Sequence, residues 1–138
     1  MTPGFALHPH TADIRMHVWA ATLPELFQTA LEALADILLP GGCHNARRLS
    51  LRRPVVLTAL DATILLVDFL SQALLYSQVQ KALFCRVRFR QLTETELRGT
   101  LYGIRVGEFI QDVKAVTYHE ALVCRLPHRY EARLVLDV

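Results

Sequence analysis

Apolar and polar residues alternate along several segments of the chain with the period of two that is typical of a half-buried strand. Between Asp13 and Ala20, apolar Ile14, Met16 and Val18 fall on one side of such a strand. The same pattern predicts strands over residues 85–90, 96–104, 115–126 and 130–138. A further strand is predicted from Arg47 to Ala59, where Pro54 indicates an edge strand or a bulge because proline cannot donate to a ladder.

Two other segments repeat their apolar residues every three or four positions, which predicts helices with one buried face. The first opens at Thr22-Leu-Pro-Glu25, a capping box in which the threonine hydroxyl accepts from the amide of Glu25. It stops at the breaker sequence Pro40-Gly-Gly. Asp61 is placed to cap the second helix, which we expect to run to about Lys81.

These elements predict the fold class. Two helices and about six strands, mostly in adjacent pairs, indicate an α+β protein with two helices packed on a largely antiparallel sheet. The length of 138 residues suits one domain, and no repeat or linker divides it, so we expect a single domain over residues 1–138.

Composition excludes some classes and leaves others open. With 52% apolar and 20% charged residues the chain is globular, and a net charge of +2 does not by itself indicate nucleic-acid binding. Cys43, Cys85 and Cys124 show no metal-ligand spacing and no signal peptide precedes them, which predicts free thiols in a cytoplasmic protein. The longest apolar run, residues 64–67, is too short to span a bilayer, so no membrane association is expected.

Candidate chemistry begins at the end of the chain. Asp137 and Val138 close the last predicted strand, so a side-chain carboxylate and main-chain oxygens meet at one strand tip. A second acidic position, Asp13, ends the motif His10-Thr-Ala-Asp just before the first predicted strand. Both features have plainer explanations, a solvated terminus and a turn held by local hydrogen bonds.

A third motif, Lys114-Ala-Val-Thr-Tyr-His119, places a lysine and a histidine near a strand end, where both side chains can also be simply exposed. Asp68 lies among apolar residues in the second helix. It either points away from the buried stripe or is buried against a partner, and helical spacing does not decide between the two.

Together these motifs resemble the archease family, and the resemblance covers nearly the whole chain. It includes His10-Thr-Ala-Asp-Ile, the helix that opens at Thr22, Leu65-Leu-Val-Asp-Phe-Leu and Lys114-Ala-Val-Thr-Tyr-His, and it ends on an Asp followed by a branched aliphatic residue. One departure is Pro9, because relatives usually have an acid before the histidine of the first motif.

The resemblance implies a function and a site. Archeases activate RtcB-type tRNA-splicing RNA ligases by promoting guanylylation and multiple turnover, and they are not themselves enzymes. It implies a Ca²⁺ or Mg²⁺ site formed by Asp13, Asp137 and Val138, which are hard oxygen ligands of the kind these cations prefer. Lys114 is implied in activation, and we place His10 and His119 beside it as candidate functional residues. The protein would contact RNA only indirectly, through the ligase.

Two alternatives from other classes stay open at this point. One is a metal-dependent phosphate-ester hydrolase that uses the two aspartates with His10 or His119 as base, although two acids are few for such a site. The other is an RNA-binding module or RNA chaperone that uses the alternating Arg86, Arg88 and Arg90. No run of exposed aromatic residues accompanies these arginines, and a solvated, charged edge strand is the favoured explanation of the pattern.

Overall fold

A computed structural model describes residues 1–44 and 48–138 of the chain. Within these ranges the elements are β1 (Gly4–Pro9), β2 (Asp13–Ala20), α1 (Leu23–Leu38), β3 (Leu51–Thr58), α2 (Ala62–Gln80), β4 (Ala82–Leu92), β5 (Glu96–Arg105), β6 (Ala115–Arg125) and β7 (Tyr130–Asp137). Every strand predicted from the sequence is present. The predicted start of the third one, Arg47, lies outside the described residues.

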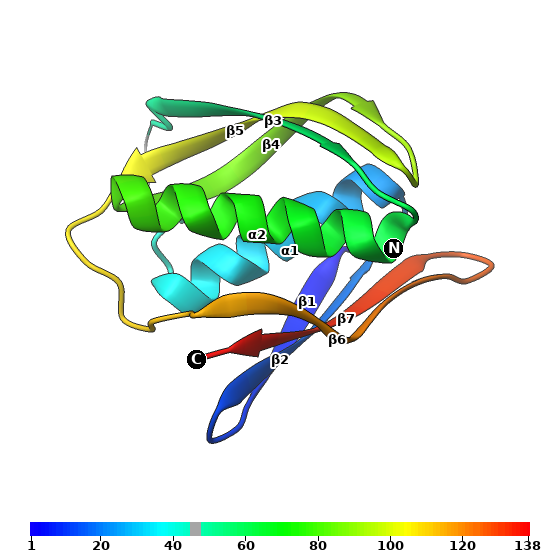
Figure 1. Cartoon of the computed structure of the whole chain (residues 1–138), viewed down its shortest axis with the longest axis horizontal. Coiled ribbons are helices and arrows are strands. Elements are labelled where there is room, and N and C mark those ends of the chain that lie inside the picture. Colours follow the sequence, from blue (N-terminus) through cyan, green and yellow to red (C-terminus); the bar gives the residue numbers. More distant parts are fainter. Residues whose placement is uncertain (45–47) are drawn as a thin grey trace.

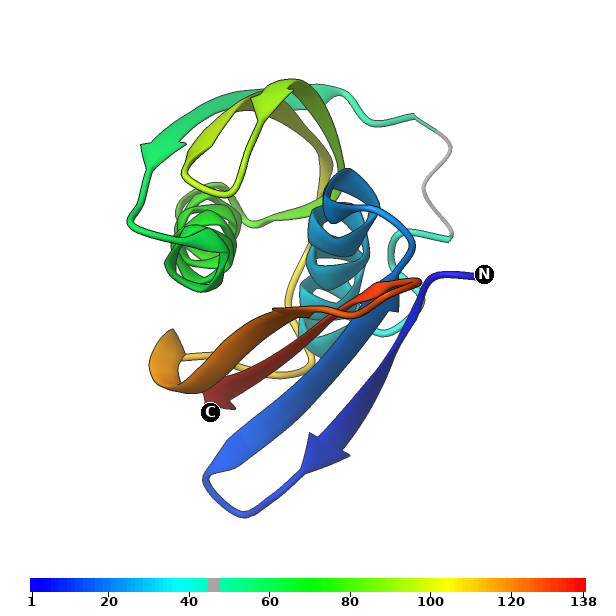
Figure 2. The same ribbon diagram turned by 90° about the vertical axis from the view of Figure 1, so that its right-hand side faces the viewer.

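The elements form three layers, with both helices between two antiparallel sheets (Figures 1 and 2). One sheet has the strand order β1-β2-β7-β6 and the other β3-β5-β4. The predicted α+β class is confirmed, but the expectation of one sheet is wrong. Local sequence predicts which neighbouring strands form hairpins. Whether the hairpins join into one sheet or form two sheets on opposite sides of the helices depends on tertiary contacts.

Strand β1 was not predicted from the sequence. It pairs with β2, and its inward-facing Phe5 and Leu7 lie opposite Val18 and Met16. Its other positions include glycine and alanine, and Pro9 ends it, so the alternation of polar and apolar residues that marks the remaining strands is absent. Pairing with β2 therefore makes this segment a strand where its own pattern does not.

Both predicted helix caps are confirmed. The amide of Glu25 donates to Oγ1 of Thr22 at 3.3 Å, and the amide of Ile64 donates to Oδ1 of Asp61 at 2.9 Å. The second helix ends at Gln80 and is followed by the C-cap Lys81, whose φ of 49° is left-handed as at many helix C-termini. Pro54 lies in β3, an outer strand of its sheet, as the sequence predicted.

One continuous core joins the three layers. Its aromatic centre is formed by Phe27 of α1, Phe69 of α2 and Phe89 of β4, with ring centres between 5.5 and 6.3 Å apart. Helix α2 is long and apolar enough to cross a membrane by length and composition alone. In this fold many of its apolar residues, among them Leu66, Phe69 and Leu70, are buried in the core.

Two glycines in β5 mark a close approach of neighbouring strands. A Cβ at Gly103 would lie 2.4 Å from the carbonyl oxygen of Leu83, and one at Gly99 would lie 2.6 Å from that of Arg88. The register of β4 against β5 shifts beside both positions, as expected at bulges. The glycines that weaken the strand pattern in the sequence are thus required by packing against β4.

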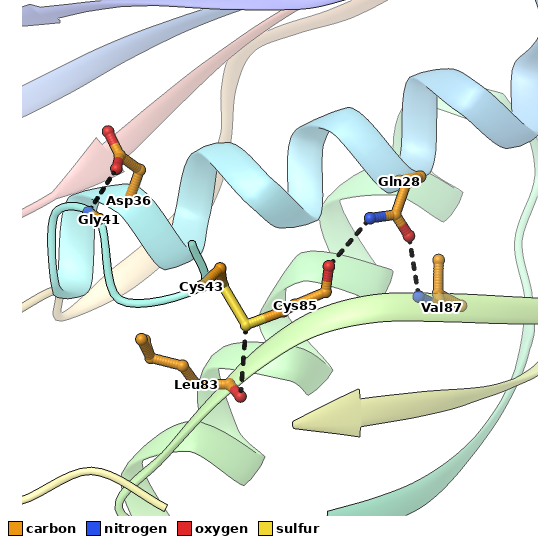
Figure 3. The surroundings of a disulfide bond; sticks show 7 residues. All are labelled: Gln28, Asp36, Gly41, Cys43, Leu83, Cys85 and Val87. Carbon is orange, nitrogen blue, oxygen red and sulfur yellow. Dashed lines mark hydrogen bonds between the residues drawn. A yellow bond between two sulfur atoms is a disulfide. The ribbon is translucent and has the colours of Figure 1, made fainter. Parts of the chain in front are cut away.

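A side chain of α1 pairs with the free edge of β4 (Figure 3). The amide nitrogen of Gln28 donates to the carbonyl of Cys85 at 2.9 Å, and its oxygen accepts from the amide of Val87 at 2.9 Å. Gln28 therefore makes the two hydrogen bonds that a neighbouring strand would have made. It covers part of an edge that would otherwise offer unpaired main-chain groups.

Cys43 and Cys85 form a disulfide with a Cα–Cα distance of 5.7 Å (Figure 3). The prediction of free thiols is wrong for this pair, and within the described residues it holds only for Cys124. The two partners are 42 positions apart, so sequence spacing does not reveal their contact. They meet because the segment that follows α1 folds back onto β4 (Figure 3).

Candidate functional site

The three motifs singled out in the sequence meet at one end of the four-stranded sheet. Asp13 at the start of β2 lies directly opposite Asp137 at the end of β7, and Asp137 lies opposite Ala115 at the start of β6. Main-chain hydrogen bonds join the same segments. The amide of Lys114 donates to Asp137 at 2.8 Å, and that of Val138 to Ala12 at 3.2 Å. The sheet thus brings together residues from both ends of the chain.

The carboxylate of Asp13 is incompletely paired. Its Oδ1 is buried and has no hydrogen-bond partner within residues 1–44 and 48–138. Nε of Arg15 lies 3.9 Å away, too far for a hydrogen bond. A buried acceptor without a partner costs free energy, and a divalent cation is one partner that removes this cost.

The surroundings fit a hard cation only in part. The side chain of Asp137 is exposed beside Asp13, and its position at the strand end brings the main chain of Val138 close to both. No group of three or more His, Cys, Asp or Glu side chains able to hold a metal occurs in the described part of the chain. Further ligands would therefore be main-chain oxygens and water, which Ca²⁺ and Mg²⁺ both accept.

A β-bulge in β6 adds a residue that the sequence did not indicate. The register of β6 against β7 is interrupted between Thr117 and Leu122, and Glu120 in this interval has a φ of 54°. Its Oε2 accepts from Nη1 of Arg15 at 2.6 Å. This hydrogen bond and the charge of the guanidinium lower the pKa of the Glu120 carboxyl. Arg15 therefore stands between Glu120 and Asp13.

The three basic candidates lie around this site. Lys114 is exposed, and none of the ion pairs among the described residues includes it. His10 lies in the turn between β1 and β2, and its amide donates to the carbonyl of Asp13 at 2.8 Å. His119 lies on the bulge, with Nε2 3.8 Å from Oε1 of Glu120 and a side chain that is 72% exposed. All three side chains are therefore open to an incoming partner.

Asp68 has a partner that the sequence did not identify. The hydroxyl of Tyr118, from the third motif, donates to its Oδ1 and joins α2 to β6. This hydrogen bond is the main reason that the pKa of Tyr118 is raised above its ordinary value of 10.0. Both residues belong to motifs singled out in the sequence, but no spacing rule pairs residues 50 positions apart.

The outward face of the same sheet carries a cavity of about 280 Å³ next to the aspartates. Five polar side chains from β1, β2, β6 and β7 line it: His8, Arg15, His17, Glu120 and Arg133. His17 also bonds Oε1 of Glu131 at 2.7 Å, which lowers the pKa of that carboxyl. This face is polar and open to solvent, whereas the opposite face of the sheet is buried against the helices.

Comparison with known proteins extends the resemblance seen in the sequence. The model of the archease protein family matches residues 5–138. The archease of Pyrococcus furiosus is 30% identical, with 95% of this chain and 96% of the relative covered. That of Methanosarcina acetivorans is 29% identical, with 94% and 92% covered.

Solved structures agree with this assignment. The solution structure of protein 1598 of Methanobacterium thermoautotrophicum has a TM-score of 0.78 at 26% identity and covers 98% of this chain and 99% of its own. A Thermotoga maritima protein described as an archease and possible chaperone shares the fold, with a TM-score of 0.61 at 19% identity and coverage of 94% and 93%. Because the family match covers every element described above except the first residue of β1, this chain belongs to the archease family.

Proposed function

We propose that this protein is an accessory protein that activates an RtcB-type RNA ligase, promoting its guanylylation and repeated turnover. The observation that carries the proposal is the convergence of Asp13, Lys114, Asp137 and Val138 at one end of the sheet. These residues come from three distant segments, and no ion pair among the described residues engages Lys114 or Asp137.

Asp13, Asp137 and a main-chain oxygen of Val138 would hold a divalent cation, either Ca²⁺ or Mg²⁺. When bound, the cation would supply positive charge next to a phosphate group of the partner's nucleotide. The unpaired Oδ1 of Asp13 and the all-oxygen donor set support this assignment. If the acid that archeases usually have at the position of Pro9 takes part in the cation site, this chain should bind the cation more weakly than those relatives.

Lys114 would add a mobile point charge to the same end of the sheet. Its main chain is bonded to Asp137, while its side chain is exposed and can extend toward a phosphate on the ligase. His10 and His119 are exposed on either side of the aspartates and are the next candidates for contact with the partner. The Arg15–Glu120 ion pair would keep the intervening surface in place.

The decisive experiment measures guanylylation and multiple-turnover ligation by an RtcB-type ligase with and without this protein. We expect Lys114→Ala to abolish activation and Lys114→Arg to keep part of it, because the role requires charge more than shape. The melting temperature should not change, since substitutions of exposed side chains usually alter stability by less than about 0.5 kcal/mol.

The control is Lys81→Asn, which removes the chain's other lysine at a left-handed position that asparagine tolerates. It should activate like the wild type. Normal guanylylation with folded Lys114→Ala would exclude the proposed role of Lys114. Phosphate-ester turnover by the protein alone would favour the hydrolase alternative instead.

A further inference from the structure

A second polar cavity, of about 710 Å³, lies away from the aspartates, where α1 meets the three-stranded sheet. Its volume falls within the range of roughly 300–1,000 Å³ that is usual for ligand pockets. Arginines contribute much of its polar lining: Arg52 of β3 and both Arg86 and Arg88 of β4. The proposed function above uses none of these residues, although the sequence left an RNA-binding role for Arg86 and Arg88 open as an alternative.

The sheet register places an aromatic ring among these arginines. Tyr102 of β5 lies opposite Arg52 on one side and Arg86 on the other, so the three side chains share one face of the sheet. Arg88 lies on the same face in the adjacent row, two residues along β4. The guanidinium carbon of Arg52 is 5.8 Å from the centre of the Tyr102 ring. The aromatic partner that the sequence pattern lacked therefore comes from a neighbouring strand.

The positive charge of this wall is only partly compensated. None of Arg52, Arg86 and Arg88 takes part in an ion pair with another described residue. Two acids of α1 also line the cavity, and Oδ1 of one of them, Asp36, accepts from the amide of Gly41 at 3.1 Å. Removal of water by the cavity walls raises the pKa of the other, Glu32, while Gln28, His44 and Arg86 oppose the rise.

We propose that this cavity binds a segment of single-stranded RNA, with a base stacked on Tyr102 and phosphates bound by Arg52, Arg86 and Arg88. A positively charged groove that includes an aromatic ring is the usual platform for single-stranded nucleic acid, because every base can stack and every phosphate is anionic. Arginine also matches phosphate geometry with paired N–H donors. This site gives the protein its own contact with RNA, in addition to any contact made through a ligase.

The test uses the full-length protein without ligase and a fluorescently labelled 12-nucleotide single-stranded RNA, with anisotropy measured at several salt concentrations. With three phosphates contacted, a plot of log affinity against log salt should have a slope of about −2. Arg88→Ala should reduce that slope by about 0.7. Tyr102→Leu should weaken binding about tenfold and leave the slope unchanged, because stacking releases no counterions.

A variant with the opposite effect makes the test stricter. Glu32→Gln removes a negative charge that lines the same cavity as Arg86 and would repel phosphate, so binding should become tighter by about twofold or more. The matched control is Arg125→Ala, which removes an arginine held 5.8 Å from a tyrosine ring, that of Tyr130, outside the cavity. It should bind RNA with nearly the wild-type affinity and slope.

Three results would overturn the proposal. The first is equal loss of affinity in Arg125→Ala and Arg88→Ala, which would indicate attraction to net charge alone. The second is equal affinity for a mononucleotide and the 12-mer, which would indicate a nucleotide pocket. The third is the absence of RNA binding by a folded wild-type protein. Because the ligase is not present, these results do not depend on whether the protein activates it.

Discussion

Removal of the Cys43–Cys85 disulfide should markedly lower the stability of the oxidised protein. Cys43→Ser is the informative substitution because Cys43 is only partly buried, so the change leaves little cavity behind. Cys85 is 8% exposed, and its truncation would add a packing defect to the loss of the bond. The substitution at Cys43 therefore isolates the effect of the cross-link.

The expected magnitude follows from the loop that the bond closes. A separation of 42 residues corresponds to about 4 kcal/mol of stabilisation at 25 °C if the cross-link acts by restricting the unfolded chain. The unfolding entropy of a chain of 138 residues is about 0.3 kcal/mol per degree. Cys43→Ser should therefore lower the melting temperature by about 14 °C.

Thermal unfolding followed by circular dichroism, with and without a phosphine reductant, tests this prediction. Reduction should lower the melting temperature of the wild type to that of Cys43→Ser and leave the variant unchanged. Cys124→Ala, at the free thiol, is the control and should respond to the reductant like the wild type. Three titratable thiols per unfolded chain before reduction, instead of one, would refute the reasoning, as would equal stability of oxidised wild type and variant.

Three further predictions concern other parts of the molecule. Ca²⁺ or Mg²⁺ at a hundredfold excess over its dissociation constant should stabilise the wild type by about 2.7 kcal/mol and leave Asp13→Asn unchanged. The control variant Glu94→Gln should be stabilised like the wild type. Equal shifts in the melting temperatures of the wild type and Asp13→Asn would remove Asp13 from the site. Asp68→Asn should bring the raised pKa of Tyr118 down toward 10.0, measured by ultraviolet titration of the phenolate. Because the pKa of Tyr118 is higher in the folded than in the unfolded protein, the hydrogen bond stabilises the fold at pH values below the unfolded-state pKa. This contribution is lost as the pH rises through the raised pKa. An unchanged titration of Tyr118 in Asp68→Asn would contradict the contact. Gln28→Leu should cost about 2 kcal/mol in denaturant unfolding, because it leaves a carbonyl and an amide of β4 without partners, and a cost near zero would mean that water replaces the side chain.

Much of the secondary structure could be predicted from the sequence because its causes are local. The caps at Thr22 and Asp61 lie within three residues of the amides that they accept from, and the buried face of each helix repeats at the helical period. Strand β1 was missed since its segment has no polar alternation, and it is a strand only because β2 pairs with it. The division into two sheets likewise depends on contacts between elements far apart in the chain.

The candidate site divides in the same way. The sequence by itself singled out Asp13, Asp137 and Lys114, because carboxylates at strand ends and a lysine within a motif are visible in the residue order. Only the tertiary structure decided that they share one end of a sheet, that Glu120 turns toward Arg15, and that Tyr118 bonds Asp68. It also decided the Cys43–Cys85 bond and the position of Tyr102 between two arginines. The physical reason is that caps and periodicity involve neighbours within a few residues, whereas cross-strand register and layer packing join positions whose separation in the chain carries no signal.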